Sequence, residues 1–277
     1  MLLRRYIERI KIFFMNTNPR VSLIFVNYRS ARYLFNALES LFSFEQERNF
    51  FEVIIVNNDV SERSALEALE RSFPIRLIEN GRNSGFGEGS NIGAKQARGE
   101  FLGFINPDIL WTGICLSDLI GAFDEKIGVL GMQILSENKE EEAWSAGKEP
   151  SLAGLFCNNV FPCRRAYWRN SDLSFPDWVS GGALFIRKDL FFSVGGFDKR
   201  FFLYFEDVDL CKKVRNYGHL VARYAKCSLI HLGGKSISSK RFQKKCFYDS
   251  QKKYFEKYRP VWENKLLGLL HFLFCRI

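Results

Sequence analysis

The chain up to residue 106 alternates between short apolar runs and segments with helical character. Residues 31–44 carry apolar side chains at helical spacing, 61–72 opens on a polar N-cap candidate, and a glycine-rich segment leads into a helix near 91–98. The apolar runs, the first of them typical of a strand buried on both faces, are 21–26, 51–56, 75–80 and 101–106. This βαβαβαβ order predicts an α/β fold with a mostly parallel, doubly wound central sheet flanked by helices.

The regular alternation of apolar runs and helical segments ends after about residue 113. A polar stretch at 136–150 predicts a loop, and the aromatic, irregular segment 151–178 predicts a cover or acceptor loop. Helices are expected at 116–123, 189–198, 204–217 and 241–259, and strands at 128–134, 178–188 and 220–224. We predict a single catalytic domain over 20–240, a basic amphipathic extension at 1–19, and a basic helix with an apolar tail at 241–277.

Composition places the chain among folded proteins. Of its 277 residues, 47% are hydrophobic and 26% are charged, which argues against a disordered, fibrous or polytopic membrane protein. Lys and Arg number 40 against 31 Asp and Glu, a formal charge of +9. Such an excess favours an anionic partner: nucleic acid, acidic lipid or a phosphorylated substrate.

The cysteines and the chain ends bear on compartment. The seven cysteines form no CxxC pair, which predicts reduced thiols in a cytoplasmic protein and argues against a zinc knuckle. The first 14 residues are basic and amphipathic but lack the cleavage site of a signal peptide. The apolar tail 266–277 is shorter than the roughly 20 residues that cross a bilayer. Either end remains able to touch a membrane surface.

Two segments suggest a phosphate or metal site. Asp108 follows the fourth buried strand, at the edge where parallel sheets bind ligands, although it is equally suited to cap the turn after Pro107. The segment Asn80–Gly99 has glycines that let the backbone approach a ligand. It is not a dinucleotide fingerprint, because Ser90 stands where the third glycine is required.

Two further segments suggest acid–base or ligand chemistry. Glu206, Asp207 and Asp209 cluster where a helix begins, directly after the apolar run 201–205. Acids in a first turn often serve only the helix dipole, but the apolar run would desolvate them in the way that suits a general base. His231 ends a strand in a glycine-rich turn, a place for a structural histidine or for a metal or phosphate contact.

Taken in order, these motifs resemble a known family. The motifs are VNYRS (26–30), VNND (56–59), NSGFGEGSNIG (83–93), NPD (106–108), SGGALFIRK (180–188), GGFDKRFFLYFEDVDL (195–210) and HLGGKS (231–236). Together they resemble the family 2 glycosyltransferases of the GT-A fold, in the rhamnosyltransferase-like branch. The resemblance covers residues 20–240 and implies an inverting transfer of a sugar from a nucleotide-diphosphate donor to an acceptor hydroxyl.

The resemblance also implies roles for single residues. Asp207 matches the catalytic base, with Glu206 orienting it or the acceptor. Asp108 matches the last acid of the family's DxD metal motif, whose first position is Asn106 here, and His231 matches a further ligand. The implied cofactor is a divalent cation, Mg²⁺ or Mn²⁺.

The remaining matches concern the donor and the acceptor. Asn57 stands where the family usually has the acid that holds the nucleobase, with Asp59 as the candidate substitute. Trp178 and Asp209 match acceptor positions. The residues implied to bind the donor are Asn27, Tyr28, Asn57, Asp59, Asn83, Gly85, Phe86, Asn91, Asn106, Gly181 and Gly182.

For partners, the resemblance implies a dTDP- or UDP-sugar, rhamnose being the best guess, and a glycan or polyprenyl-diphosphate-linked acceptor of cell-surface polysaccharide or lipopolysaccharide. Nucleic acid is not expected. The C-terminal segment 241–277 is predicted either to attach the protein peripherally to the inner face of the cell membrane or to pack on the domain. Two rivals remain: a nucleotidyltransferase, and a catalytically degenerate binding partner suggested by Asn57 and Asn106.

Overall fold

The computed structural model describes residues 18–45, 47, 49–113, 116–142, 144–155, 171–233 and 239–274. Most of the predicted extension 1–19, the middle of the predicted cover loop and the end of the HLGGKS motif lie outside these residues. In this part of the chain, no helix is long and apolar enough to cross a membrane.

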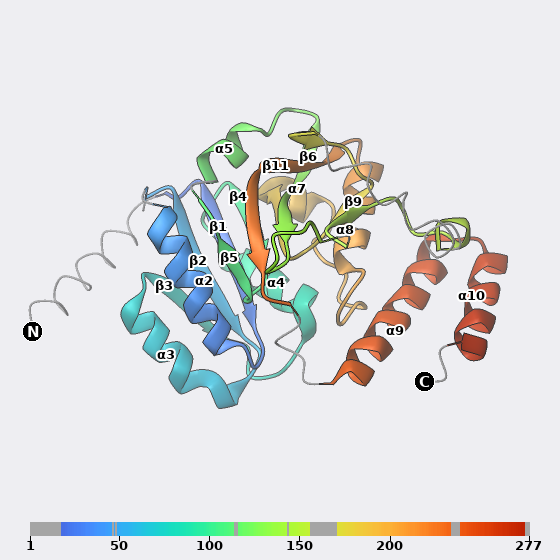
Figure 1. Ribbon diagram of the computed structural model, residues 1–277, viewed down its shortest axis with the longest axis horizontal. Coiled ribbons are helices and arrows are strands. Elements are labelled where there is room, and N and C mark those ends of the chain that lie inside the picture. Colours follow the sequence, from blue (N-terminus) through green and yellow to red (C-terminus); the bar gives the residue numbers. More distant parts are fainter. Residues whose placement is uncertain are drawn as a thin grey trace, which may run out of the picture.

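The first half of the chain forms the parallel part of the sheet that the apolar runs predict. The strands β1 (Val21–Asn27), β2 (Phe51–Asn57), β3 (Ile75–Glu79) and β4 (Phe101–Ile105) lie in the order β3-β2-β1-β4, and every pair is parallel. The connecting helices are α2 (Ala31–Phe44), α3 (Arg63–Ser72), preceded by the 3-10 turn η1 (Val60–Glu62), and α4 (Gly85–Gln96). All four carboxyl ends therefore meet at one edge of the sheet (Figure 1).

The second half adds antiparallel strands. β10 (Ala183–Arg187) runs antiparallel to both β4 and β6 (Ile127–Leu135), and β11 (Leu220–His231) runs parallel to β6. β5 (Ile109–Trp111) and β8 (Leu173–Ser174) pair antiparallel with β11, and a separate ribbon joins β7 (Ala146–Gly147) to β9 (Trp178–Val179). The sheet is thus mixed, with its parallel core at β1–β4.

Both faces of the sheet are covered, which explains why the runs of β1 and β2 are apolar apart from Ser22 and Glu52. Leu23 and Phe25 of β1 pack on one face with the apolar stripe of α2, while Ile24 packs on the other. The helices that complete the fold are α5 (Leu116–Gly121), α7 (Lys188–Ser193) and α8 (Glu206–Asn216). The core cluster on the face of Ile24 includes buried residues of α7 and α8.

Several predicted boundaries are wrong, each for a physical reason. The helix expected near 91–98 begins at Gly85, because its glycines face the sheet: a Cβ at Gly89 would lie 2.8 Å from Val26, and one at Gly93 would lie 2.6 Å from Ile24. The strand expected at 178–188 is interrupted by the loop 180–182. β11 continues to His231 through an irregularity after Tyr224 instead of ending there.

The C-terminal segment forms two helices, α9 (Lys240–Tyr258) and α10 (Val261–Phe274), which lie side by side at the end of the molecule farthest from β3 (Figure 1). The basic helix predicted at 241–259 is confirmed. Leu267 of α10 is buried in a cluster with Tyr254 and Phe255 of α9 and with Phe201. One side of α10 therefore packs on the domain.

Candidate active site

The loops around the carboxyl edge of the parallel strands are joined by backbone hydrogen bonds. The Asn106 N–H, just after β4, donates to the Gly182 carbonyl at 3.0 Å. The Gly181 N–H donates to Oδ2 of Asp207 at 2.8 Å. The loop 180–182 thus links the NPD segment to the first turn of α8, so the predicted metal, donor and base motifs come together.

Asp207 is held at this junction by backbone groups. Its Oδ1 accepts a hydrogen bond from the Val208 N–H at 2.8 Å, beside the one from Gly181. A Cβ at Gly181 would lie 3.1 Å from the Phe86 ring and 3.4 Å from the Asp207 Cβ, so these three residues pack directly on one another. Burial raises the pKa of Asp207 above the ordinary value of an aspartate, as suits a general base.

Glu206 lies deeper than Asp207. Its side chain faces Gly87 of α4, and its Oε2 has no hydrogen-bond partner among the described residues. Burial, and then the charge of Asp207, raise the pKa of Glu206 well above its usual range. Glu206 therefore keeps its proton at pH values where an exposed glutamate has lost it.

The turn before α8 is strained. Tyr204 and Phe205 have φ angles of 68° and 67°, the left-handed region that non-glycine residues seldom adopt. Consecutive residues of this kind persist only where the surrounding structure holds them, and they gather at functional sites. The strained turn directly precedes Glu206 and Asp207 and sets the direction in which α8 begins.

Glu206→Gln is expected to stabilise the protein at alkaline pH. In the folded protein, the pKa of Glu206 lies above its ordinary value of 4.5. At a pH between the ordinary and the folded pKa, the unfolded chain has released a proton that the folded chain keeps. Folding stability therefore falls as pH rises through this window, and glutamine removes the penalty. Thermal unfolding at pH 8 should show a melting temperature several degrees above wild type, and at pH 4 the two proteins should agree. Equal melting temperatures at pH 8 would contradict this assignment.

Asp108 and His231 meet beside the NPD loop. The antiparallel pairing of β5 with β11 sets His231 opposite Ile109, and Oδ1 of Asp108 lies 3.4 Å from Nε2 of His231. Both side chains are nearly buried, and Nδ1 of His231 has no hydrogen-bond partner among the described residues. The oxygen and nitrogen donors fit a divalent cation. Among the described residues, no three or more His, Cys, Asp or Glu side chains are grouped so that they could hold a metal ion.

The predicted nucleobase residues Asn27 and Asn57 lie in a buried network. Nδ2 of Asn27 donates to Oδ1 of Asn57 at 3.0 Å and to Glu62 at 2.9 Å, and Nδ2 of Asn57 donates to Glu79 at 3.0 Å. Both asparagines are fully buried and their side chains support the strand ends, so their predicted donor contacts stay predictions. Glu62 and Glu79 were missed, although Glu79 ends an apolar run in the sequence.

Tyr28 and Asp59 lie nearer the surface at the same edge. Oδ1 of Asp59 accepts hydrogen bonds from the Ser61 N–H and hydroxyl, and this interaction lowers the pKa of Asp59. Arg29 lies 3.5 Å from the other oxygen of Asp59 and stacks over the Tyr28 ring. Tyr28 and Asp59 are thus less buried than Asn27 and Asn57, and their nucleoside contacts stay predictions.

The predicted contacts in the glycine-rich segment serve largely to build its turn. Oδ1 of Asn83 accepts from the Gly85 N–H at 3.1 Å, and the side-chain amide of Asn91 bonds both backbone groups of Phe197 at 2.8 and 2.9 Å. A Cβ at Gly85 would lie 2.0 Å from the Phe202 carbonyl oxygen. Asn91 therefore ties α4 to the turn at Phe197, and its predicted donor contact is not supported.

The two predicted acceptor residues differ. The Trp178 ring lies over Gly147 and its Nε1 donates to the Lys148 carbonyl, at the margin of the loop 180–182. Asp209 is fully buried and bonded by Lys257 and Tyr258. The acceptor contact predicted for Asp209 stays a prediction; in this structure its side chain is engaged by the protein and has no exposed surface.

Comparison with known proteins identifies the family. The family model described as "Glycosyl transferase family 2" matches residues 22–191, more than half of the chain. The chain belongs to glycosyl transferase family 2. The expected family and the GT-A fold are thereby confirmed, and the transferase class with them.

Individual relatives refine this placement within family 2. The chain is 29% identical to N-acetylglucosaminyl-diphospho-decaprenol L-rhamnosyltransferase of Mycobacterium tuberculosis, over 76% of this chain and 75% of that protein. It is 24% identical to rhamnosyltransferase WbbL of Escherichia coli, over 80% and 88%. The solved mannosyltransferase PcManGT from Pyrobaculum calidifontis, in complex with GDP-Man and Mn²⁺, superposes with a TM-score of 0.61 at 16% identity, over 91% and 70%. Rhamnosyltransferases are thus among its relatives.

Proposed function

We propose that this family 2 transferase moves a rhamnosyl group, with inversion, from a nucleotide-diphosphate donor to a hydroxyl of a lipid-linked glycan. The observation that carries the proposal is the junction at the loop 180–182, where one backbone turn holds Asp207 through Gly181 and the NPD segment through Gly182. A base and a diphosphate site on opposite sides of a sugar are what inverting transfer requires.

In this mechanism Asp207 accepts the proton of the acceptor hydroxyl as that oxygen attacks C1 of the donor sugar. The new C1–O bond forms on the face opposite the diphosphate, and the old C1–O bond breaks with its electron pair going to the diphosphate. Gly181 and Val208 fix the direction of the Asp207 carboxylate through their N–H groups. Phe86 packs against Gly181 and excludes water from that side.

Asp108 and His231 are the residues that would hold a divalent cation. When bound, the cation offsets the charge that builds up on the leaving diphosphate. A nitrogen ligand beside a carboxylate favours Mn²⁺ over Mg²⁺. The Mn²⁺ in the mannosyltransferase complex supports this choice.

The sugar and the acceptor are proposed from the relatives. Two rhamnosyltransferases match over three quarters or more of this chain, and one name specifies a diphospho-decaprenol-linked N-acetylglucosamine. An O-antigen biosynthesis protein of Myxococcus xanthus, 28% identical, supports a role in surface polysaccharide. We therefore propose dTDP-rhamnose as donor and a polyprenyl-diphosphate-linked saccharide as acceptor.

Thermal shift against nucleoside diphosphates and their sugars, with and without Mn²⁺, tests the donor site. We expect a Mn²⁺-dependent rise in melting temperature for dTDP and dTDP-rhamnose. Binding without any transfer to an acceptor would favour the degenerate binding partner. Release of pyrophosphate from dTTP and a sugar phosphate would identify a nucleotidyltransferase instead.

The helix pair α9–α10 is proposed to meet the membrane that carries such an acceptor. On α10, the residues at i, i+4, i+7 and i+8 form an exposed apolar face that does not include the buried Leu267. The residues of this face are Trp262, Leu266, Leu269 and Leu270, beside the exposed Val261. The neighbouring helix α9 is rich in lysine, which suits anionic lipid.

In a flotation experiment, the wild-type protein is expected to float with anionic vesicles. Salt at 0.5 M is expected to weaken its binding to the vesicles. The double variant Trp262→Glu/Leu269→Glu should lower the bound fraction about tenfold or more, because two apolar side chains no longer enter the lipid. The control Tyr217→Glu changes a residue of comparable exposure next to α8. Equal flotation of the helix-pair and control variants would reject this surface.

A further inference from the structure

Helix α9 lies against the loop 198–205, the segment that leads into the base-bearing helix. The Ser250 hydroxyl donates to the Leu203 carbonyl at 2.8 Å, and Nζ of Lys253 donates to the Arg200 carbonyl at 2.8 Å. Phe205 packs against Tyr254 in the same cluster. The strained residues at 204 and 205 are therefore held from outside by α9.

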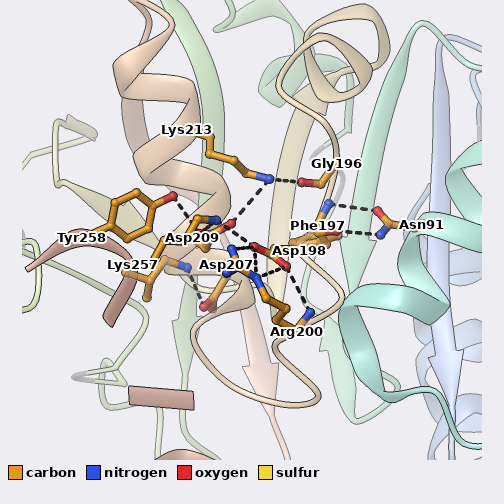
Figure 2. A network of polar contacts seen from close by, with 11 residues as sticks. Asn91, Gly196, Phe197, Asp198, Arg200, Asp207, Asp209, Lys213, Lys257 and Tyr258 are labelled. Carbon is orange, nitrogen blue, oxygen red and sulfur yellow. Dashed lines mark hydrogen bonds and ion pairs between the residues drawn. The ribbon is translucent and has the colours of Figure 1, made fainter. Parts of the chain in front are cut away.

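Lys257 of α9 joins both ends of this loop (Figure 2). Its Nζ lies 2.8 Å from Oδ2 of Asp198, where the loop begins, and 2.5 Å from Oδ1 of Asp209, in the first turn of α8. Tyr258 donates its hydroxyl to the same Asp209 oxygen at 2.8 Å. One ammonium group thus spans the turn that sets the direction of Asp207.

The charges around this contact are matched. Arg200 pairs with Asp198, and Lys213 lies 3.5 Å from the second oxygen of Asp209. Asp209 has no exposed surface, so its carboxylate depends on Lys257, Lys213 and Tyr258 in place of water. Lys257 reaches both Asp198 and Asp209 only when α9, the loop 198–205 and α8 are arranged in this way.

We infer that Lys257 is a positioning residue for the catalytic base: it holds the strained turn closed, and the turn directs Asp207 at the Gly181 amide. The inference rests on the base role proposed for Asp207. Lys257 lies beyond the segment matched by the family model, so the family match itself assigns it nothing.

Lys257→Met should reduce kcat about 100-fold, because a displacement of about 1 Å at the base is sufficient for such a loss. The donor KM should stay unchanged, since Lys257 contacts Asp198 and Asp209 and not the NPD loop. The control Lys252→Met removes an exposed lysine of the same helix and, measured with a water-soluble acceptor so that membrane attachment plays no part, should leave kcat unaltered. Lys257→Arg, which keeps a cation able to bridge two carboxylates, should restore most of the rate.

The double variant Lys257→Met/Asp209→Asn separates positioning from stability. Lys257→Met alone leaves a buried carboxylate poorly compensated and should lower the melting temperature by roughly 10 °C. Adding Asp209→Asn removes that charge and should recover the melting temperature, while kcat stays low because the bridge to Asp198 is still missing. Recovery of kcat together with stability would overturn the inference.

Amide hydrogen exchange makes the result independent of the proposed reaction. In Lys257→Met, peptides spanning 198–209 should exchange at least about tenfold faster than in Lys252→Met. Unchanged exchange would refute the positioning role even if the protein transfers sugar. Faster exchange in a protein that transfers no sugar would support the role of Lys257 in holding the loop 198–205 and would refute the proposed function.

Discussion

Asp207→Asn is expected to lower the kcat of sugar transfer by about 1,000-fold, because the amide cannot take the proton of the attacking hydroxyl. Donor binding should be retained, since the donor diphosphate is assigned to the opposite side of the sugar. Initial rates and calorimetric donor titrations measure the two quantities. Asp118→Asn, an exposed aspartate on α5, is the control and should behave as wild type.

The pH profile provides a second readout of the same residue. Burial raises the pKa of Asp207, and the base works only in its ionised form. Activity should therefore be full at high pH and be lost as pH falls through a value above that of an ordinary aspartate. Loss of donor binding in Asp207→Asn with the fold intact would contradict the assignment. So would a wild-type activity that is lost on acidification only at the ordinary pKa of an aspartate.

Asp108→Ala is expected to abolish the effect of Mn²⁺ on donor binding and to raise the donor KM about 100-fold. Its carboxylate is the hard oxygen ligand of the proposed cation, and losing several kcal/mol of charge stabilisation corresponds to a factor of this size. Thermal shift with dTDP, with and without Mn²⁺, gives the binding effect, and steady-state kinetics gives KM.

Asp118→Asn again serves as the control. His231→Ala should weaken the response to Mn²⁺ less than Asp108→Ala does, because the carboxylate supplies the charge. An undiminished Mn²⁺ response in Asp108→Ala would show that the cation is held elsewhere, and the role given to the NPD loop would be rejected.

The parallel half of the fold could be predicted because its signals are local. The runs 21–26 and 51–56 are apolar apart from Ser22 and Glu52, since helices cover both faces of β1 and β2. The stripe of α2 repeats at the helical period since only one side of that helix meets the sheet. The apolar run of a strand and the apolar stripe of a helix each follow from how that one element is buried.

The antiparallel half depends on partners that are distant in sequence. β5 has three residues and no pattern of its own; it is a strand because β11 pairs with it. The same pairing brings His231 to Asp108 across more than a hundred positions. The motif order suggested that these two residues belong to one site, but their contact could not be read from either segment.

Several side chains predicted at the site are instead buried against the protein. Asn27, Asn57, Asn91 and Asp209 occupy positions that the resemblance assigns to ligands, yet hydrogen bonds to the protein engage their side chains. A polar residue near a functional motif either supports the motif or touches the substrate, and the sequence does not distinguish the two. Lys257 went unnoticed for a related reason: it lies in a lysine-rich helix whose preceding lysines, Lys252 and Lys253, are exposed.

The most direct measurement is a mass-spectrometric transfer assay. Wild type and Asp207→Asn would be incubated with dTDP-rhamnose and a polyprenyl-diphosphate-linked N-acetylglucosamine, with Mn²⁺ or with EDTA. We predict one added deoxyhexose per acceptor for wild type in Mn²⁺, a loss of product in EDTA, and only trace product for Asp207→Asn. Equal product from wild type and Asp207→Asn would contradict the claim that Asp207 is the base of a metal-assisted glycosyl transfer.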